Sequence, residues 1–144
     1  MVPSDRRTQK QLASKDPVAR ELGWAQAEIM NVFWRKKSAT VPELLEATNK
    51  KRAQKKGAEI AYTTVLTVVQ RLHRRGLLER IPEGRGFRYT PTQTREELLE
   101  SWSDELIDRL LSDFGEIAVA RLDDRMRSLD SERKQKLREA RRSK

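Results

Sequence analysis

Apolar residues first recur with a regular spacing from Leu22 onward. Ile29, Met30 and Phe33 follow the period of an amphipathic helix and predict one over about Trp24–Arg35. The residues that come next are small, polar and basic. They predict a turn with room for a short strand.

A second helix is predicted from its starting residues. Thr40 is a good N-cap, and Pro42 falls in the first turn, where a missing N–H costs nothing. Residues 48–58 then form a basic stretch with one glycine and no apolar face, so they are either a solvated extension of this helix or a loop. The apolar and small residues assigned to the helix are Val41, Leu44, Leu45 and Ala47.

A third helix and a hairpin follow. The helix is predicted over about Tyr62–Arg75, and Gly76 ends it at the position just past the last turn. Residues 77–81 and 87–90 are typical of two strands, and the glycine-rich residues 82–86 between them indicate a turn. Helix, short strand, helix, helix and hairpin is the order of a winged helix-turn-helix. The expected fold is therefore mainly α with a small β-hairpin.

The third helix divides into two faces. Val65, Val68, Val69 and Leu72 lie on one side and predict a buried seam. The opposite side is small and polar first and basic later, which suits a recognition helix that meets base edges with its first residues and phosphates with its last. The residues that we expect to contact DNA from this helix are Thr63, Thr64, Thr67, Gln70, Arg71 and Arg74.

The hairpin adds two further candidates. Arg85 stands at its tip between two glycines, and Arg88 follows on the return strand. A tip arginine of this kind can enter a narrow minor groove or bind a phosphate. Residues 48–58 also hold basic side chains that are either further phosphate contacts or a solvated face: Lys50, Lys51, Arg52, Lys55 and Lys56.

The C-terminal third is predicted to be helical over Thr94–Phe114, over about Glu116–Ser128, and again from Ser131. Its apolar stripe is not needed to complete the winged-helix core, so we expect it to be buried against a second copy of the chain. The residues assigned to this dimer contact are Leu99, Trp102, Leu106, Leu110, Phe114, Leu122 and Met126.

Charge supports a polyanionic partner. The formal net charge is +9, and residues 21–95 carry fifteen basic side chains against seven acidic ones, whereas residues 96–144 carry eleven against thirteen. A localised positive field attracts nucleic acid by counterion release. We expect three parts: a flexible basic arm over residues 1–20, a winged-helix domain over 21–92 and a helical dimerisation region over 93–144.

The same composition argues against other classes. The chain has no cysteine and one histidine, His73, which is predicted at a helix edge among arginines. We find no phosphate loop and no histidine–carboxylate cluster, so we expect no catalysis, no cofactor and no metal site. No apolar run is long enough for a signal or membrane helix, so a cytoplasmic protein is expected. A winged-helix RNA-binding protein or a scaffold is the alternative, although Phe87 and Tyr89 are expected to face the core rather than stack on bases.

Several separate motifs, in the same order, resemble those of the penicillinase repressor family, the BlaI/MecI-type winged-helix repressors. The resemblance covers about residues 20–130. The motifs are Leu22–Trp34, Ala61–Leu72, Gly76–Arg80, Gly84–Pro91 and Arg95–Leu98.

The resemblance implies a homodimer on a dyad-symmetric DNA operator and repression of β-lactam resistance genes. Repression of an unrelated operon and non-specific nucleic-acid binding are the alternatives. It also implies that Thr63, Thr64, Thr67 and Arg71 touch bases, whereas Gln70 is added from the helical wheel.

The chain departs from the family pattern at several points. Some relatives have a basic residue where this chain has Leu66, and the absence of cysteine sets the copper-sensing branch aside. Well-known members are cut at an Asn-Phe bond by a signal-activated protease, and this chain has no such bond. Either another bond is cut or the signal differs.

Overall fold

The computed structural model describes residues 15–142, and its first helix begins earlier than the sequence pattern predicts. This helix, α2 (Pro17–Leu22), starts where the carboxylate of Asp16 accepts a hydrogen bond from the Val18 N–H at 3.0 Å. The side chains of Val18, Ala19 and Leu22 are buried in the core. The prediction of a flexible arm is therefore wrong for residues 17–20, and residues 1–14 lie outside the described part.

The helices α3 (Trp24–Lys36) and α4 (Val41–Gln54) confirm the two predicted at the start of the pattern. Between them, Ala39–Thr40 forms the short strand β1. Thr40 caps α4 in both directions. Its hydroxyl accepts from the Glu43 N–H at 3.3 Å, and the Glu43 carboxylate accepts from the Thr40 N–H at 3.0 Å. The basic residues 48–58 combine the two predicted alternatives. Their first part extends α4 to Gln54, and a turn follows.

The helix α5 (Tyr62–Arg74) precedes the hairpin of β2 (Leu78–Glu83) and β3 (Gly86–Pro91). Gly76, at φ 77°, adopts the left-handed conformation that ends a helix. The sheet order is β1-β3-β2, antiparallel throughout. The strands are longer than predicted, because pairing continues to Glu83 and Gly86 and leaves two residues in the turn.

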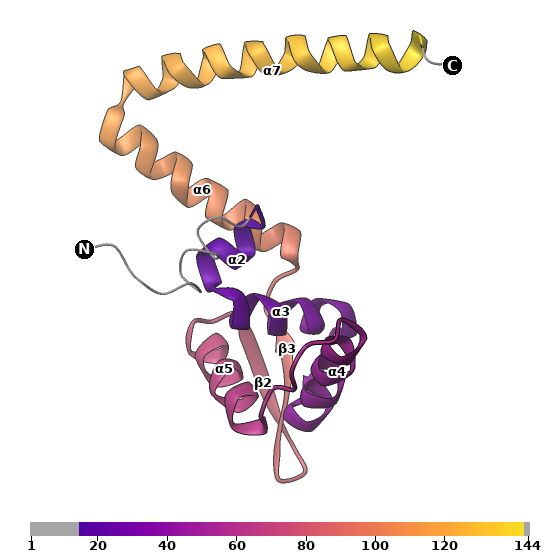
Figure 1. The fold of residues 1–144 in the computed structure, drawn as a ribbon. Helices are drawn as coiled ribbons and strands as arrows, with labels where there is room; N and C mark the ends of the chain where they lie inside the picture. The colour runs from indigo at the N-terminus through magenta and orange to yellow at the C-terminus, as the bar shows by residue number, and fades with distance from the viewer. Residues whose placement is uncertain (1–14, 143–144) are drawn as a thin grey trace, which may run out of the picture. The chain divides into compact units, whose positions relative to one another are not determined.

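The core of the first unit, which ends at Leu99, draws on all of these elements. Figure 1 shows α3, α4 and α5 gathered beside the hairpin, whose tip extends beyond the ends of α4 and α5. This is a winged helix-turn-helix, as the sequence predicts. Its largest fully buried side chains are Phe33, Ile29, Met30, Leu44, Leu72 and Leu78.

The second unit, from Glu100 onward, comprises most of α6 (Arg95–Phe114) and all of α7 (Glu116–Arg142). Gly115, at φ 56°, separates the two helices. The predicted break before Ser131 is wrong, because α7 is continuous. The Ser131 hydroxyl donates to the Arg127 carbonyl, four residues earlier, at 3.2 Å, which is a usual hydrogen bond for a serine within a helix. Within residues 15–142, no helix is both long and apolar enough to span a bilayer.

Thr48, within α4, and Thr40, which caps it, should respond oppositely to the same change. The Thr48 side chain is buried and its hydroxyl has no hydrogen-bond partner in the structure, so Thr48→Val should stabilise the protein by about 1 kcal/mol. Thr40→Val removes the N-cap and should destabilise it by about 1 kcal/mol. Urea unfolding followed by circular dichroism measures both changes. A loss of stability in Thr48→Val would show that the hydroxyl has a partner in solution.

Candidate nucleic-acid interface

The exposed face of α5 is built from the six residues that the sequence predicts for it. Its buried side is the seam of Val65, Val68, Val69 and Leu72, each at most 4% exposed. Because the seam fixes how the helix is rotated, the opposite side must point to solvent. The residues exposed there are Thr63, Thr64, Thr67, Gln70, Arg71 and Arg74.

The side chain of Thr67 is oriented by its own helix. Its hydroxyl donates to the carbonyl of Thr63 at 2.8 Å. With the hydrogen used in this way, the oxygen is left to accept from an amino group, and the methyl is free for an apolar contact. These are the two ways in which a threonine distinguishes bases in a major groove.

The hairpin carries Arg85 at its tip, in the two-residue turn with Gly84. Gly84 has φ 60°, a left-handed conformation that a tight hairpin turn requires, and the Arg85 side chain is exposed. Arg80 lies over the ring of Phe87, with its guanidinium carbon 4.1 Å from the ring centre. The guanidinium covers one face of the Phe87 ring, and Phe87 is of intermediate exposure. Tyr89 is buried, as predicted.

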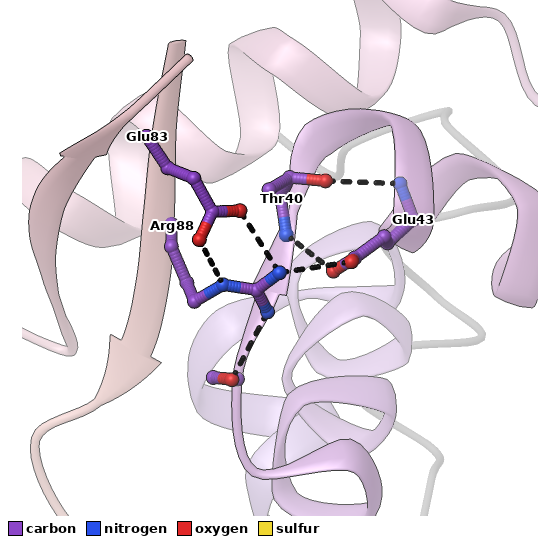
Figure 2. A network of polar contacts seen from close by, with 5 residues as sticks. Thr40, Glu43, Glu83 and Arg88 are labelled. Carbon is purple, nitrogen blue, oxygen red and sulfur yellow. Dashed lines mark hydrogen bonds and ion pairs between the residues drawn. The ribbon is translucent and has the colours of Figure 1, made fainter.

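Arg88 does not present a free cation. Figure 2 shows its guanidinium between two carboxylates: it donates to Glu83 at 3.0 Å and to Glu43 at 2.9 Å. A further bond, at 3.2 Å, goes to the hydroxyl of Ser38. Arg88 therefore has a structural role, since this side chain ties the hairpin to the start of α4, and its DNA contact stays a prediction.

These contacts shift the ionisation of the two partners. Hydrogen bonds from Arg88, and then from the Thr40 backbone, hold the pKa of the Glu43 carboxyl below its ordinary value of 4.5. The hydrogen bonds to Glu83 and Glu43 raise the pKa of Arg88. Both groups are thus charged at neutral pH, and the tie is ionic.

A model of the family described as penicillinase repressor matches residues 22–142. The chain belongs to the penicillinase repressor family. Two curated relatives, both named transcriptional regulator BlaI, come from the CDC 1551/Oshkosh and H37Rv strains of Mycobacterium tuberculosis. Each is 37% identical over 79 residues, which cover 54% of this chain and 53% of the relative. The chain thus spans about half the length of the curated relatives it matches.

Solved structures give weaker similarities. The solution structure of the DNA-binding domain of the repressor BlaI is 29% identical, with a TM-score of 0.43, over 51% of this chain and 82% of that one. A MarR family regulator from Neisseria meningitidis is 18% identical, with a TM-score of 0.41, over 83% and 82% of the two chains. Family membership and the element order together identify this protein as a winged-helix member of the penicillinase repressor family.

In this member of the penicillinase repressor family, sequence analysis missed the residues that support the interface. Glu43 and Glu83 were not expected to hold Arg88. Asn49 hydrogen-bonds the backbone of Ile60, and Arg52 donates to the carbonyl of Ala58; neither was expected to hold the turn before α5. The one visible signal was the Thr-x-x-Glu pattern of residues 40–43, which marks a capping box.

The residues predicted for dimerisation are only partly covered. Leu106, Phe114 and Met126 are each more than half exposed. Leu99, which ends the first unit, and Trp102, Leu110 and Leu122 are of intermediate exposure.

Other chemistry finds little support. Residues 15–142 hold no group of three or more His, Cys, Asp or Glu side chains that could bind a metal. His73 is partly exposed at the edge of α5, and its ring lies 6.2 Å from that of Tyr89, edge to face. His73 therefore packs against the hairpin through Tyr89.

Removing the charge of Glu43 should loosen the hairpin in a pH-dependent way. Glu43→Gln keeps an oxygen for the Thr40 N–H but loses the ionic bond to Arg88, so its melting temperature at neutral pH should be lower than that of the wild type. Because the folded pKa is lowered, this stabilisation is complete above the ordinary value of 4.5 and is lost as the pH falls through the folded pKa. The gap between the two proteins should therefore close in acid.

Thermal melts across the acid range measure this gap. Glu46→Gln is the matched control, since Glu46 is exposed on the same helix and has no ion pair among the described residues. A gap that stays constant with pH would contradict the ionic tie.

Proposed function

We propose that this protein is a homodimeric repressor that binds a dyad-symmetric operator in double-stranded DNA, with α5 in the major groove. The observation that carries the proposal is the exposed face of α5. Hydroxyl, amide and guanidinium groups occupy it, and an apolar seam buries the other side. Such a face offers hydrogen bonds to base edges and charge to phosphates.

The hairpin supports the same docking. Arg85 is exposed at the tip, and the Arg88 tie holds the hairpin to α4, so the tip has a defined position relative to the helix-turn-helix. A tip arginine reaches the minor groove or a phosphate beside the recognition helix. Arg88 itself is left out of the proposed interface.

A second copy of the chain is the proposed partner of α6 and α7. Within the second unit, Ala118 is buried and the large apolar side chains are partly or largely exposed. Exposed apolar surface of that extent marks an interaction site, and a two-fold dimer matches a palindromic operator. The proposed contact residues are Leu99, Trp102, Leu106, Leu110, Phe114, Leu122 and Met126.

The BlaI relatives extend the proposal to the regulated genes. By resemblance, the operator belongs to β-lactam resistance genes or to another operon under similar control. A signal-activated protease is the inducing partner that the family suggests, at a bond other than Asn-Phe.

The function is tested by binding to duplex DNA from the promoter of the protein's own gene. Unlabelled operator should compete far better than bulk DNA, and the titration should end at two chains per operator. Thr67→Ala should change which base pairs are tolerated, by about 1–3 kcal/mol, whereas Arg71→Ala should weaken binding. Fluorescence anisotropy measures each affinity.

Arg138→Ala is the control, since this arginine is exposed on α7 and lies twelve residues past Met126, the last proposed dimer contact. It should leave affinity unchanged. Equal competition by operator and bulk DNA would contradict sequence-specific repression and favour non-specific binding.

A further inference from the structure

The segment between α4 and α5 is held in place by one amide side chain. The Ile60 N–H donates to Oδ1 of Asn49 at 2.8 Å, and Nδ2 of Asn49 donates to the Ile60 carbonyl at 3.2 Å. Both backbone groups of one residue are thus bound by the preceding helix, and the Ile60 side chain is buried. The segment is therefore an ordered turn rather than a loose loop.

Arg52 adds a second set of ties. Its guanidinium forms a paired contact with Glu28 of α3, at 2.7 and 2.9 Å, and donates to the Ala58 carbonyl at 3.1 Å. The Glu28 carboxylate raises the pKa of Arg52 through its hydrogen bond. Arg52, which the sequence offered as a phosphate contact, is thus used inside the protein.

The lysines at the end of α4 and in the segment that follows it are left unpaired. Lys50, Lys51, Lys55 and Lys56 form no ion pair with any described residue. Like charges on an ordered helix end and turn repel one another and cannot move apart as they would on a flexible chain. Lys56 is also held at φ 57°, which costs a non-glycine residue about 1–2 kcal/mol. An arrangement with these costs favours an anionic partner.

Two of the lysines line a groove that reaches α5. The groove has a volume of about 970 Å³, and Lys51 and Lys55 line it together with Thr64 and Arg71. Thr64 and Arg71 form one edge of the exposed face of α5. The groove therefore extends the proposed DNA-binding surface from α5 toward the end of α4 and the segment after it.

The acidic groups of the groove are mostly neutralised. Asp16 pairs with Arg95 at 3.1 Å, and Glu28 pairs with Arg52 at 2.7 Å. Glu59 is the one carboxylate among the described lining residues that has no ion pair. Three unpaired cations against one carboxylate leave the groove positive.

We propose that Lys51, Lys55 and Arg71 form a preformed phosphate-binding groove that holds the backbone of duplex DNA along the side of α5. The inference rests on the proposed function, because duplex DNA is its ligand. Lysine reads phosphate as a point charge and not base identity. The groove thus contributes affinity that is independent of sequence, and α5 supplies the discrimination.

The test is the salt dependence of DNA binding by the double variant Lys51→Gln/Lys55→Gln. Each lost phosphate contact lowers the steepness of log K against log salt by about 0.9, so the variant should be shallower than the wild type by about two. Its affinity for operator and for unrelated duplex should fall by the same factor. Anisotropy titrations at a series of salt concentrations measure both quantities.

Lys50→Gln/Lys56→Gln is the matched control. It makes the same charge change with one lysine on α4 and one in the segment after it, but away from the groove lining. Its slope should stay closer to that of the wild type. An unchanged slope in the groove variant, or an equal change in the control, would overturn the proposed groove. A loss confined to operator DNA would overturn it too, since that indicates base reading.

These outcomes separate the inference from the proposed function. A protein that prefers its operator but shows no slope change in the groove variant keeps its function and loses the groove. A protein that binds all duplexes equally, with the slope lowered as expected, keeps the groove and loses the sequence-specific role.

Discussion

The arrangement depends on the burial of one seam of α5. Val65, Val68, Val69 and Leu72 pack into the core of the winged helix, and each such side chain contributes about 1.5–3 kcal/mol when fully buried. Rotating the helix would expose the seam and bury threonine hydroxyls and arginine guanidinium groups instead. The core therefore decides which residues face outward. The polar face of α5 is a consequence of packing before it is a surface for binding.

An ionic contact and an amide contact then hold the two segments that flank α5 in the chain, namely the hairpin after it and the turn before it. Arg88 links the hairpin after α5 to the capped start of α4, and Asn49 links the end of α4 to the turn before α5. Each fixes the position of a basic segment: the hairpin that carries Arg85 in one case, and the segment that carries Lys55 in the other. Both of these side chains stay exposed and accessible to a large ligand.

The sequence predicted what periodicity and capping control. Local patterns predict the helices α3, α4 and α5, the short strand β1 and the hairpin. They also predict which side of α5 is exposed. The helix α2 was missed because six residues are too few to show a period. The continuous α7 was missed because its apolar residues thin out, whereas helix-forming charged residues carry it on. The structural role of Arg88 was missed because its partner Glu43 is forty-five residues away, a pairing that only the folded sheet creates.

The central claim is that two copies of α5 enter successive major grooves on one face of a DNA duplex. Dimethyl sulfate probing of the bound operator tests it, because the reagent methylates guanine N7 in the major groove and adenine N3 in the minor groove. The account predicts protection of guanine N7 in two symmetric segments whose centres lie about 10 base pairs, or a multiple of that, apart. Protection of adenine N3 alone, or of a single segment without symmetry, would contradict it.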